Sequence, residues 1–349
     1  MQQPFATGAV ESPVGQVPQA GTDLRPRDRW GTFKARWGVG RMNYKVDPGL
    51  YALGQPGGDS PVLVTANYKM SFDALRREMG GRNAWLLVLD TAGINVWCAA
   101  GKGTFGTAEL AARIEASGLS QVVRHREIIL PQLGAPGVAA HLIKRQTGFT
   151  VVYGPILAAD LPAFLEAGCR ATPAMRRRRF PLAERLVLIP VEMVGALKWV
   201  LAAVPLLFLL GGLGGAQGYW TAALSHGLFA GLAFLTGVLA GTALMPLLLP
   251  VLPGRAFAAK GLAAGLVAAL PLLGWRAASS PSSPCELAGL LLIMLALASY
   301  YGMNFTGSST YTSLSGVKKE MHWAVPLQIG AGVVGGGLWL VSRWMGWGG

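Results

Sequence analysis

The sequence of 349 residues has 30 Lys and Arg against 17 Asp and Glu, a formal net charge of +13, yet 52% of its residues are hydrophobic. This combination is typical of a membrane-spanning region joined to a soluble one. Three scattered cysteines exclude an iron–sulfur cluster built by this chain alone, because such a cluster takes four thiolates. The basic charge does not indicate a nucleic-acid partner, since aromatic-rich RNA-binding motifs are absent.

Residues 1–40 are polar and rich in Gly and Pro, which predicts a mobile N-terminal tail. Strand-like and helix-like runs alternate in the next part of the chain, which predicts a domain over residues 41–175. We expect strands over residues 61–66, 84–90, 127–130 and 150–153, and helices over 72–79, 108–117, 138–146 and 161–167. Continuous apolar strands separated by helices predict an α/β Rossmann-like domain, with a mostly parallel sheet covered by helices on both faces. A ligand is then expected at the carboxyl ends of the strands.

One short segment after the second strand carries the most informative cysteine. Residues 95–102 read Asn-Val-Trp-Cys-Ala-Ala-Gly-Lys. Asn95 is a good N-cap, which places Val96, Trp97 and Cys98 in the first turn of a helix. A thiol in that turn faces unpaired backbone N–H groups and the positive end of the helix dipole, which favour its thiolate form.

The remainder of this segment predicts a short helix. Gly101 is expected to end it after little more than one turn, with Lys102 nearby as a further positive charge. The local pattern alone leaves an alternative open, because a lone Cys beside Trp and Ala is usually a small buried hydrophobe.

The glycines that follow match two nucleotide-binding motifs in outline. Residues 101–106 fit G-x-G-x-x-G, with Glu127 about 20 residues further on. That motif should follow a strand directly, whereas here a predicted helix intervenes, and the phosphate-binding P-loop pattern fits less well. We expect instead that these glycines let the backbone approach a bulky planar ligand.

The second half of the chain is predicted to be a membrane domain. A basic linker over residues 176–186 opens with four arginines, and residues 187–349 are mostly apolar. Five runs are long enough to span a bilayer, which takes about 20 helical residues; they cover residues 187–210, 219–245, 256–275, 286–307 and 323–345. The distribution of Lys and Arg places the N-terminal domain in the cytoplasm and the C-terminus outside the cytoplasmic (inner) membrane. The arginine run is also expected to contact anionic membrane lipid.

Two parts of the sequence resemble corrinoid proteins. The octapeptide 95–102 resembles the motif of the mercury-methylating corrinoid protein family, in which the cysteine lies on a cap helix and is the lower axial ligand of cobalt. Residues 62–73 and 304–321 are similar to the corrinoid-binding domain of the corrinoid iron–sulfur protein of acetyl-CoA synthesis. The resemblance implies a corrinoid-binding domain over residues 41–175. Residues 304–321 fall at the cytoplasmic end of the fourth span and in the polar loop after it, which is expected to return against that domain.

The resemblance also implies the residues of the site. Cys98 is expected to be the catalytic residue and the axial ligand of cobalt. Expected cofactor contacts are Thr65, Asn67, Asn95, Val96, Trp97, Cys98, Ala99, Ala100, Gly101, Lys102 and Gly103. Trp97 could stack on the macrocycle or anchor the helix in the core. The Asp-x-His-x-x-Gly motif of other cobalamin proteins is missing, so a thiolate is the strongest protein ligand available.

The activity implied is a methyltransferase that passes a methyl group from methyl-cobalt(III) to Hg(II) and forms methylmercury. Mercury is thiophilic, as soft metals are, and suits a methyl group made electron-rich by a thiolate. Because this chain has no redox centre of its own, a ferredoxin-like iron–sulfur protein is expected as electron donor. A methyltetrahydrofolate-linked pathway is the expected methyl donor.

Alternative functions and some residue roles stay open. A chain of this build could methylate another soft acceptor, such as a metalloid or a thiol. A transporter with a cytoplasmic ligand-binding domain is also conceivable, although no clear inverted repeat supports it. Cys169 is either a structural cysteine or a relay for mercury, and Glu192 and Lys198 are charges within the first apolar run.

Overall fold

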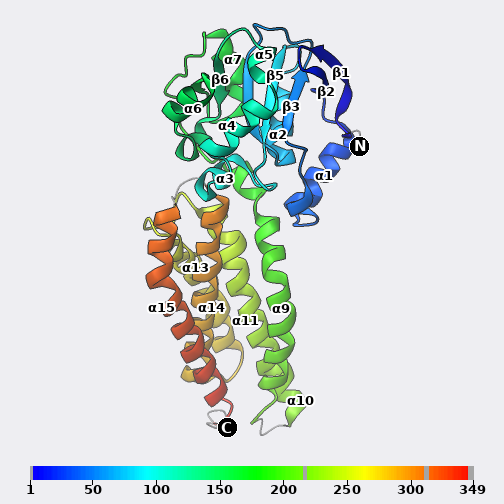
Figure 1. The fold of residues 1–349 in the computed structure, drawn as a ribbon. Helices are drawn as coiled ribbons and strands as arrows, with labels where there is room; N and C mark the ends of the chain where they lie inside the picture. Colours follow the sequence, from blue (N-terminus) through cyan, green and yellow to red (C-terminus); the bar gives the residue numbers. More distant parts are fainter. Residues whose placement is uncertain (1–2, 215–217, 310–313, 345–349) are drawn as a thin grey trace. The chain divides into compact units, whose positions relative to one another are not determined.

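The computed structural model describes residues 3–214, 218–309 and 314–344 (Figure 1). The chain divides into two compact units, Met1–Arg179 and Phe180–Gly349. The boundary falls within the basic segment 176–186.

The N-terminal unit is built on a seven-stranded sheet with the order β1-β2-β3-β5-β4-β6-β7. Its strands are β1 Ala6–Ser12, β2 Gly15–Ala20, β3 Gly49–Leu53, β4 Val62–Ala66, β5 Ala84–Leu89, β6 Glu127–Leu130 and β7 Thr150–Tyr153. The central strand β4 runs parallel to β5 and β6, and β6 runs parallel to β7. Only β3 against β5 and β1 against β2 are antiparallel pairs among the described strands. The predicted mostly parallel α/β sheet is confirmed.

Helices cover both faces of this sheet, as predicted from its continuous apolar strands. They are α1 Pro26–Arg36, α2 Lys69–Glu78, α3 Val96–Lys102, α4 Thr107–Ala116, α5 Leu119–Val122, α6 Ala140–Thr147 and α7 Leu161–Glu166, with the short 3₁₀ turns η1 Arg41–Asn43, η2 Gln132–Gly137 and η3 Ala158–Asp160. Side chains of α3 to α6 join Val62 and Val64 in the core on one face, whereas α2 and α7 pack with Leu63 on the other. The strand period of two explains why neighbouring residues of β4 enter different cores.

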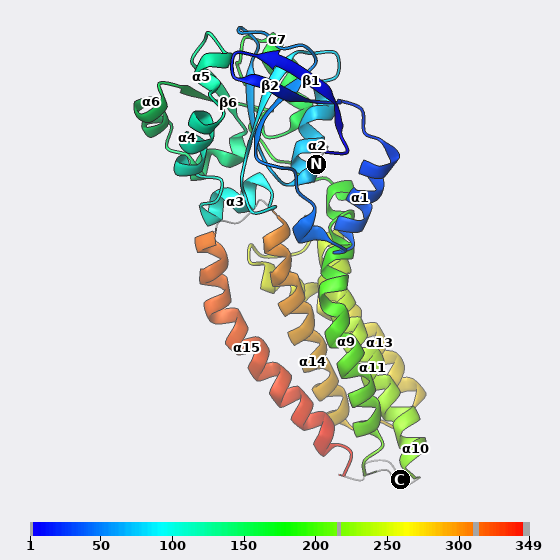
Figure 2. The same ribbon diagram turned by 45° about the vertical axis from the view of Figure 1, so that its right-hand side comes forward.

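Residues 3–40 correct the prediction of a mobile tail. They contain helix α1 and the hairpin β1–β2, which joins the edge of the sheet where Gln19 pairs with Ala52 of β3 (Figure 2). Phe5 is only 1% exposed, and its ring packs 4.6 Å from that of Phe72 and 5.7 Å from that of Tyr51. Gly and Pro content misled the prediction because the few apolar residues of this segment enter the core of the folded unit.

A buried cluster of four charges attaches α1 to α2. Lys69 Nζ lies 2.8 Å from Asp28 and 2.6 Å from Asp73, while Arg76 lies 2.9 Å from Asp28 and 2.7 Å from Asp73. All four side chains are buried, so each charge is compensated by two opposite charges away from water. Burial opposes ionisation of Asp28, but Lys69 and Arg76 outweigh it and hold the pKa of that carboxyl below 3.8.

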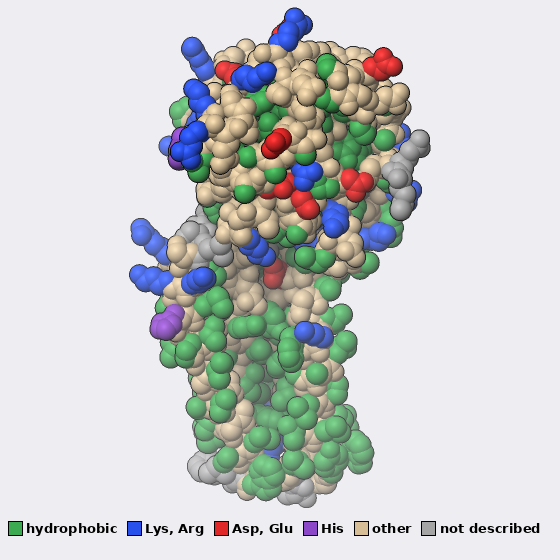
Figure 3. Space-filling model, in the orientation of Figure 1, with side chains coloured by type: hydrophobic (Ala, Val, Ile, Leu, Met, Phe, Trp, Pro, Cys, Tyr) green, Lys and Arg blue, Asp and Glu red, His purple; other side chains and the backbone are tan. Residues whose placement is uncertain are grey.

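The C-terminal unit is helical. Its elements are α8 Leu182–Leu186, α9 Ile189–Gly211, α10 Tyr219–Ala222, the π-helix η4 Ala223–Gly227, α11 Leu228–Leu239, the π-helix η5 Ala240–Leu244, α12 Met245–Leu248, α13 Phe257–Ser279, α14 Pro284–Asn304, η6 Phe305–Ser308 and α15 Leu314–Val341. Within the described residues, five stretches are long and apolar enough to cross a membrane: Leu182–Gly211, Tyr219–Leu248, Phe257–Ser279, Pro284–Gly307 and Ser315–Ser342. Figure 3 shows hydrophobic side chains over much of this unit's visible surface. The predicted number of spans is confirmed.

The fifth span begins earlier than predicted. Helix α15 starts at Leu314, so residues 314–321 are helical rather than part of the predicted polar loop between the fourth and fifth spans; residues 310–313 of that loop lie outside the described residues. Within this helical stretch the buried carboxylate of Glu320 accepts a hydrogen bond from the Ala258 N–H at the start of α13. Glu320 thereby caps α13, because it accepts a hydrogen bond from a backbone N–H that has no partner within the first turn of that helix.

Close backbone contact and one buried carboxylate hold the spans together. A Cβ atom at Gly289 of α14 would lie 2.6 Å from the Gly335 carbonyl oxygen of α15, so only glycine allows this approach. The carboxylate of Glu286 is 3.0 Å from His226 Nδ1 and contacts two arginines, Arg276 at 3.2 Å and Arg343 at 3.0 Å.

The two charged residues within the first apolar run, Glu192 and Lys198, lie in different surroundings. Glu192 lies in the first turn of α9. Lys198 is exposed, and its Nζ lies 5.1 Å from the ring centroid of the neighbouring Trp199. Lys198 thus projects outward from the helix.

The buried charge cluster predicts a local stability effect. Replacing Asp28 with Ala leaves Lys69 and Arg76 each with one compensating carboxylate fewer, so the free energy of opening of α1 should fall by about 3 kcal/mol. Hydrogen exchange over residues 26–36, measured by mass spectrometry on the full chain in detergent, checks this. The control is Asp59→Ala, whose pair with Arg124 is solvent-exposed and should contribute at most about 1 kcal/mol.

The same carboxylate predicts a pH dependence. Because the folded pKa of Asp28 lies below its ordinary value, its contribution is complete above about pH 4 and is lost as the pH falls through the folded pKa. Protection of α1 in the wild type should therefore decline in acid, and Asp28→Ala should flatten that decline. Identical acid profiles for the two proteins would contradict the role given to Asp28.

Candidate functional site around Cys98

The structure confirms how the Cys98 helix begins and corrects how it ends. Asn95 has extended backbone angles, φ −67° and ψ 161°, and its side chain accepts a hydrogen bond of 2.8 Å from the Cys98 N–H. Cys98 is therefore the third residue of α3, as predicted. The helix continues past Gly101 through Lys102, and Gly103 ends it with a left-handed φ of 84°. The glycine run 101–106 thus lies at the end of a helix, where the dinucleotide motif does not fit.

One side of α3 enters the core and the other faces outward. Ala99 and Ala100 are buried in the core of this face of the sheet, and Val96 packs against it. Trp97 and Cys98 are half-buried, while Gly101 and Lys102 are exposed. Because residues four apart share a helix face, Cys98 and Lys102 lie on one outward side. The alanines take the core positions, so Cys98 does not act as the buried hydrophobe of this helix.

Trp97 belongs to the outward side as well. Val96, Ala99 and Ala100 supply the contacts of α3 to the described core cluster, in which Trp97 has no part. Of the two roles considered for Trp97, core anchor and ligand contact, the packing of the described core cluster does not support the first.

The site lies where the strand order reverses. From β4 the chain continues to β5 on one side and later to β6 on the other, so the loops after these strands meet at the carboxyl edge of the sheet. Helix α3 follows β5 and packs against η2, which follows β6. Gly137 of η2 permits this contact, because a Cβ there would lie 3.0 Å from Ala100 Cα and 2.1 Å from the Phe105 carbonyl oxygen. Ligands of such sheets bind at this reversal.

Asn67 organises the loop that leads into α3. Its side-chain Oδ1 accepts hydrogen bonds from the Thr91 N–H at 3.1 Å and the Gly93 N–H at 3.0 Å, and its side-chain Nδ2 donates to Asp90 at 3.0 Å. Asn67 is 1% exposed and Thr65 is 2% exposed. Thr65 and Asn67 were predicted to make polar contacts to a cofactor from the end of β4. Both side chains are buried in the structure, and Asn67 fixes the position of the loop.

Several groups near Cys98 were missed by sequence reasoning. The guanidinium carbon of Arg41 lies 5.7 Å from the ring centroid of Tyr68. Burial raises the pKa of the Tyr68 hydroxyl, Arg41 and Arg36 lower it, and Cys98 raises it, so Tyr68 lies within electrostatic reach of these three groups. Arg36 and Arg41 are more than 50 residues from Cys98 in sequence, and no local motif indicates that the fold brings them together.

Thr104, directly after α3, has a buried hydroxyl oxygen with no hydrogen-bond partner among the described residues. An unpaired buried hydroxyl costs free energy, so it indicates a group that a ligand can satisfy. No sequence pattern singled out this residue.

Cys169 is not part of this site. Cys169 packs against the hydrophobic core that includes side chains of α7, on the opposite face of the sheet from α3. Burial raises the pKa of its thiol, and Glu127 raises it further, which favours the unreactive thiol form. None of the three cysteines, all within the described residues, is disulfide-bonded. The described residues also contain no group of three or more His, Cys, Asp or Glu that could hold a metal ion.

Comparison with known proteins relates the N-terminal unit to acetyl-CoA-forming complexes. The model of the CO dehydrogenase/acetyl-CoA synthase delta subunit family matches residues 39–165, a range that includes α3 and its supporting loops. Residues 304–321, whose similarity was noted from sequence, lie outside this range. The resemblance to a subunit of acetyl-CoA synthesis is thus confirmed for the N-terminal unit.

Individual relatives agree with the family match. Gamma subunits of the acetyl-CoA decarbonylase/synthase complex are 33% identical over 128 residues in Archaeoglobus fulgidus, 32% over 128 in Methanopyrus kandleri and 35% over 127 in Methanocaldococcus jannaschii. Each alignment covers 36% of this chain but only 26–27% of the relative. The chain thus spans about a quarter of the length of the curated relatives that it matches.

The contact between η2 and α3 predicts a sensitive glycine. In Gly137→Ala the new methyl group would meet backbone atoms of Ala100 and Phe105, so α3 must shift and the protein should lose about 1 to 3 kcal/mol. Hydrogen exchange over residues 96–103 should become faster. Gly57→Ala is the matched control, because a Cβ there has nothing within 4 Å. Unchanged exchange in Gly137→Ala would show that η2 does not support α3.

Proposed function

We propose that this chain is a membrane-anchored, corrinoid-dependent methyltransferase that passes a methyl group to Hg(II), with Cys98 as the axial ligand of cobalt. The observation that carries the proposal is the outward, half-buried position of Cys98 on a helix at the strand-order reversal, where sheets of this kind bind ligands. The similarity of residues 39–165 to subunits of acetyl-CoA-forming complexes supports it, as does the resemblance of residues 95–102 to the mercury-methylating family.

The residues around Cys98 fit such a cofactor. Cys98 offers one soft donor, and Trp97 and Gly101 give its helix face an aromatic ring beside a position without a side chain. The orphan hydroxyl of Thr104 can bond to a polar group at the edge of a large ligand. Lys102 contributes positive charge on the same face as the thiolate. The unused hydroxyl is an observation independent of the sequence motif.

The loop holds Cys98 in place before any ligand binds. Asn95 accepts a hydrogen bond from the Cys98 N–H, and Asn67 fixes the turn at Thr91 and Gly93 that leads into the helix. A ligand held by such a supporting shell needs little reorganisation on binding. Asn67 and Asn95 are therefore positioning residues, and Cys98 is the residue that would contact the metal.

The chemistry follows from the ligand type. When bound, a methylated corrinoid supplies a methyl group on cobalt that a soft electrophile can accept. As a ligand of that cobalt, the sulfur of Cys98 would donate electron density and favour transfer of the methyl group to an electrophile. Hg(II) is a fitting acceptor because it is soft and thiophilic.

The remaining assignments concern partners and location. A ferredoxin-like iron–sulfur protein would return the cofactor to its reduced state, and a methyltetrahydrofolate-linked system would supply the methyl group. The chain would lie in the cytoplasmic membrane with its N-terminal unit in the cytoplasm. Two basic residues on the opposite side, Arg276 and Arg343, are paired with the buried Glu286 and so do not weigh against that orientation.

Replacing Cys98 tests the proposal directly. The full chain is purified in detergent, reconstituted with cobalamin, and supplied with a methyl donor and a Hg(II)–thiol complex. Cys98→Ala should change the visible spectrum at cobalt and lower methylmercury formation by more than about 100-fold, since loss of mere supporting residues already costs 10- to 100-fold.

Cys169→Ala is the control, because this cysteine lies on the other face of the sheet. The activity and visible spectrum of this variant should match those of the wild type. A Cys98→Ala protein with wild-type spectrum and activity would refute the ligand role. Product analysis with Hg(II) beside metalloid and thiol acceptors separates mercury methylation from transfer to another soft acceptor.

A further inference from the structure

Helix α1 has an unusual distribution of side chains. Three aromatic residues point outward, with Trp30 59%, Phe33 49% and Trp37 41% exposed. Their spacing of three and four residues places them on one face. The rings of Trp30 and Phe33 stack with centroids 5.2 Å apart, and that of Trp37 lies 6.0 Å from Phe33. A surface helix normally turns its apolar face inward, so this arrangement is reversed.

The inward face explains why α1 cannot simply rotate. Asp28 is buried in the charge cluster with Lys69 and Arg76, and Ala35 is fully buried. A Cβ at Gly31 would lie 2.7 Å from the ring of Tyr44, and the Tyr44 hydroxyl donates to the Asp28 carbonyl oxygen at 3.0 Å. These contacts hold one face of α1 against the unit.

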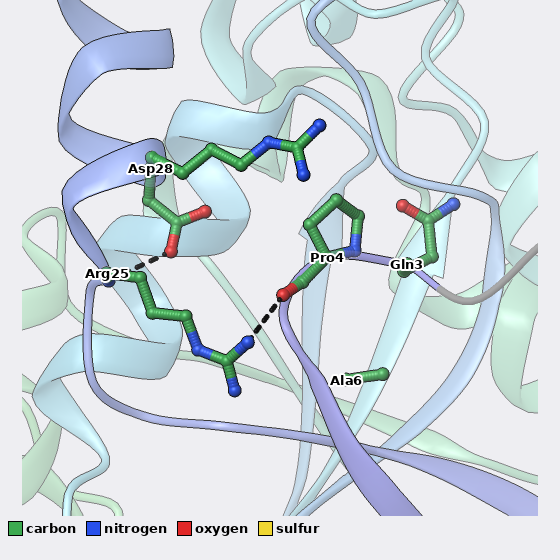
Figure 4. Close-up of a pocket in the computed structure, with 6 residues that line it drawn as sticks. Gln3, Pro4, Ala6, Arg25 and Asp28 are labelled. Atoms are coloured by element: carbon green, nitrogen blue, oxygen red, sulfur yellow. Dashed lines mark hydrogen bonds between the residues drawn. The ribbon is translucent and has the colours of Figure 1, made fainter.

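The start of the helix is also fixed (Figure 4). The Asp28 carboxylate accepts a hydrogen bond of 3.1 Å from the Arg25 N–H, and the Arg25 guanidinium donates to the Pro4 carbonyl oxygen at 3.2 Å. With both its first turn and its inner face fixed, α1 keeps its aromatic side in the solvent.

The same segment is strongly basic. Residues 25–46 contain seven basic side chains and a single acidic one, Asp28, which is consumed in the buried cluster; the basic residues are Arg25, Arg27, Arg29, Lys34, Arg36, Arg41 and Lys45. Arg29 and Lys34 are exposed beside the aromatic rings, and Val39 and Met42 extend the apolar surface beyond the helix. The outward surface thus combines aromatic rings with cationic charge.

We propose that the outward face of α1 binds the surface of an anionic lipid bilayer. Trp residues prefer the membrane–water interface, and Lys and Arg beside them attract anionic headgroups. Five apolar helices long enough to span a bilayer belong to the same chain, so a lipid surface is available to this helix without diffusion from solution. An acidic protein partner would match the charge but gives no reason for a tryptophan-rich row.

Photo-crosslinking on the full chain in lipid nanodiscs tests this. The photoreactive amino acid p-benzoylphenylalanine replaces Trp30, or Val14 as a control at an exposed apolar position in the β1–β2 hairpin. In nanodiscs that contain phosphatidylglycerol, Trp30 should give at least about fivefold more lipid adduct than Val14. Arg29→Gln and Lys34→Gln should each lower the amount of lipid adduct at Trp30 by up to about fivefold, because one basic residue near an anionic membrane surface strengthens binding by about that factor.

Two outcomes would overturn the proposal. Lipid adduct at Trp30 no higher than at Val14 would show that the face does not meet the bilayer. Crosslinks from Trp30 to a second protein chain in place of lipid would assign the face to a protein partner. The readout does not use methyl transfer, so it is independent of the function proposed for Cys98.

Discussion

The position of Cys98 depends on a single buried amide. Asn67 follows the central strand β4, and its side chain bonds to Asp90, Thr91 and Gly93 in the loop after the neighbouring strand. An amide buried without partners would cost a few kcal/mol, so its bonds to this loop are obligatory rather than optional. Because β4 and β5 are held in register as parallel strands, these hydrogen bonds also fix the position at which α3 begins. The axial-ligand candidate is therefore positioned by the sheet itself.

The features that could be predicted from sequence are local ones. The apolar runs of β4 and β5, the N-cap at Asn95 and the five apolar spans each depend on residues close together in the chain. The features that were missed depend on distant residues. The hairpin β1–β2 pairs with β3, and Phe5 before it packs on Phe72 and Tyr51. Helix α3 continues to Lys102 and packs against η2, where a Cβ on Gly137 would meet Ala100 and Phe105.

The reversal of α1 shows the same limit more clearly. A hydrophobic pattern assigns the core side of a helix by assuming that apolar residues face inward. In α1 the inward residue is Asp28, which is stable there only because Lys69 and Arg76, over 40 residues later, neutralise it. Buried charge pairing thus overrides the apolar pattern, and it also changes how the net charge of the chain is interpreted, since several basic residues are consumed inside the fold.

The basic segment and the Cys98 helix share a physical connection. Gly93, at the turn held by Asn67, lies so close to η1 that a Cβ there would be 3.0 Å from the Met42 carbonyl oxygen. Arg41 of η1 in turn lies over the Tyr68 ring, and Tyr68 is within electrostatic reach of both Arg41 and Cys98. Within the N-terminal unit, the segment that follows the aromatic and basic face of α1 is therefore packed against the turn that begins α3.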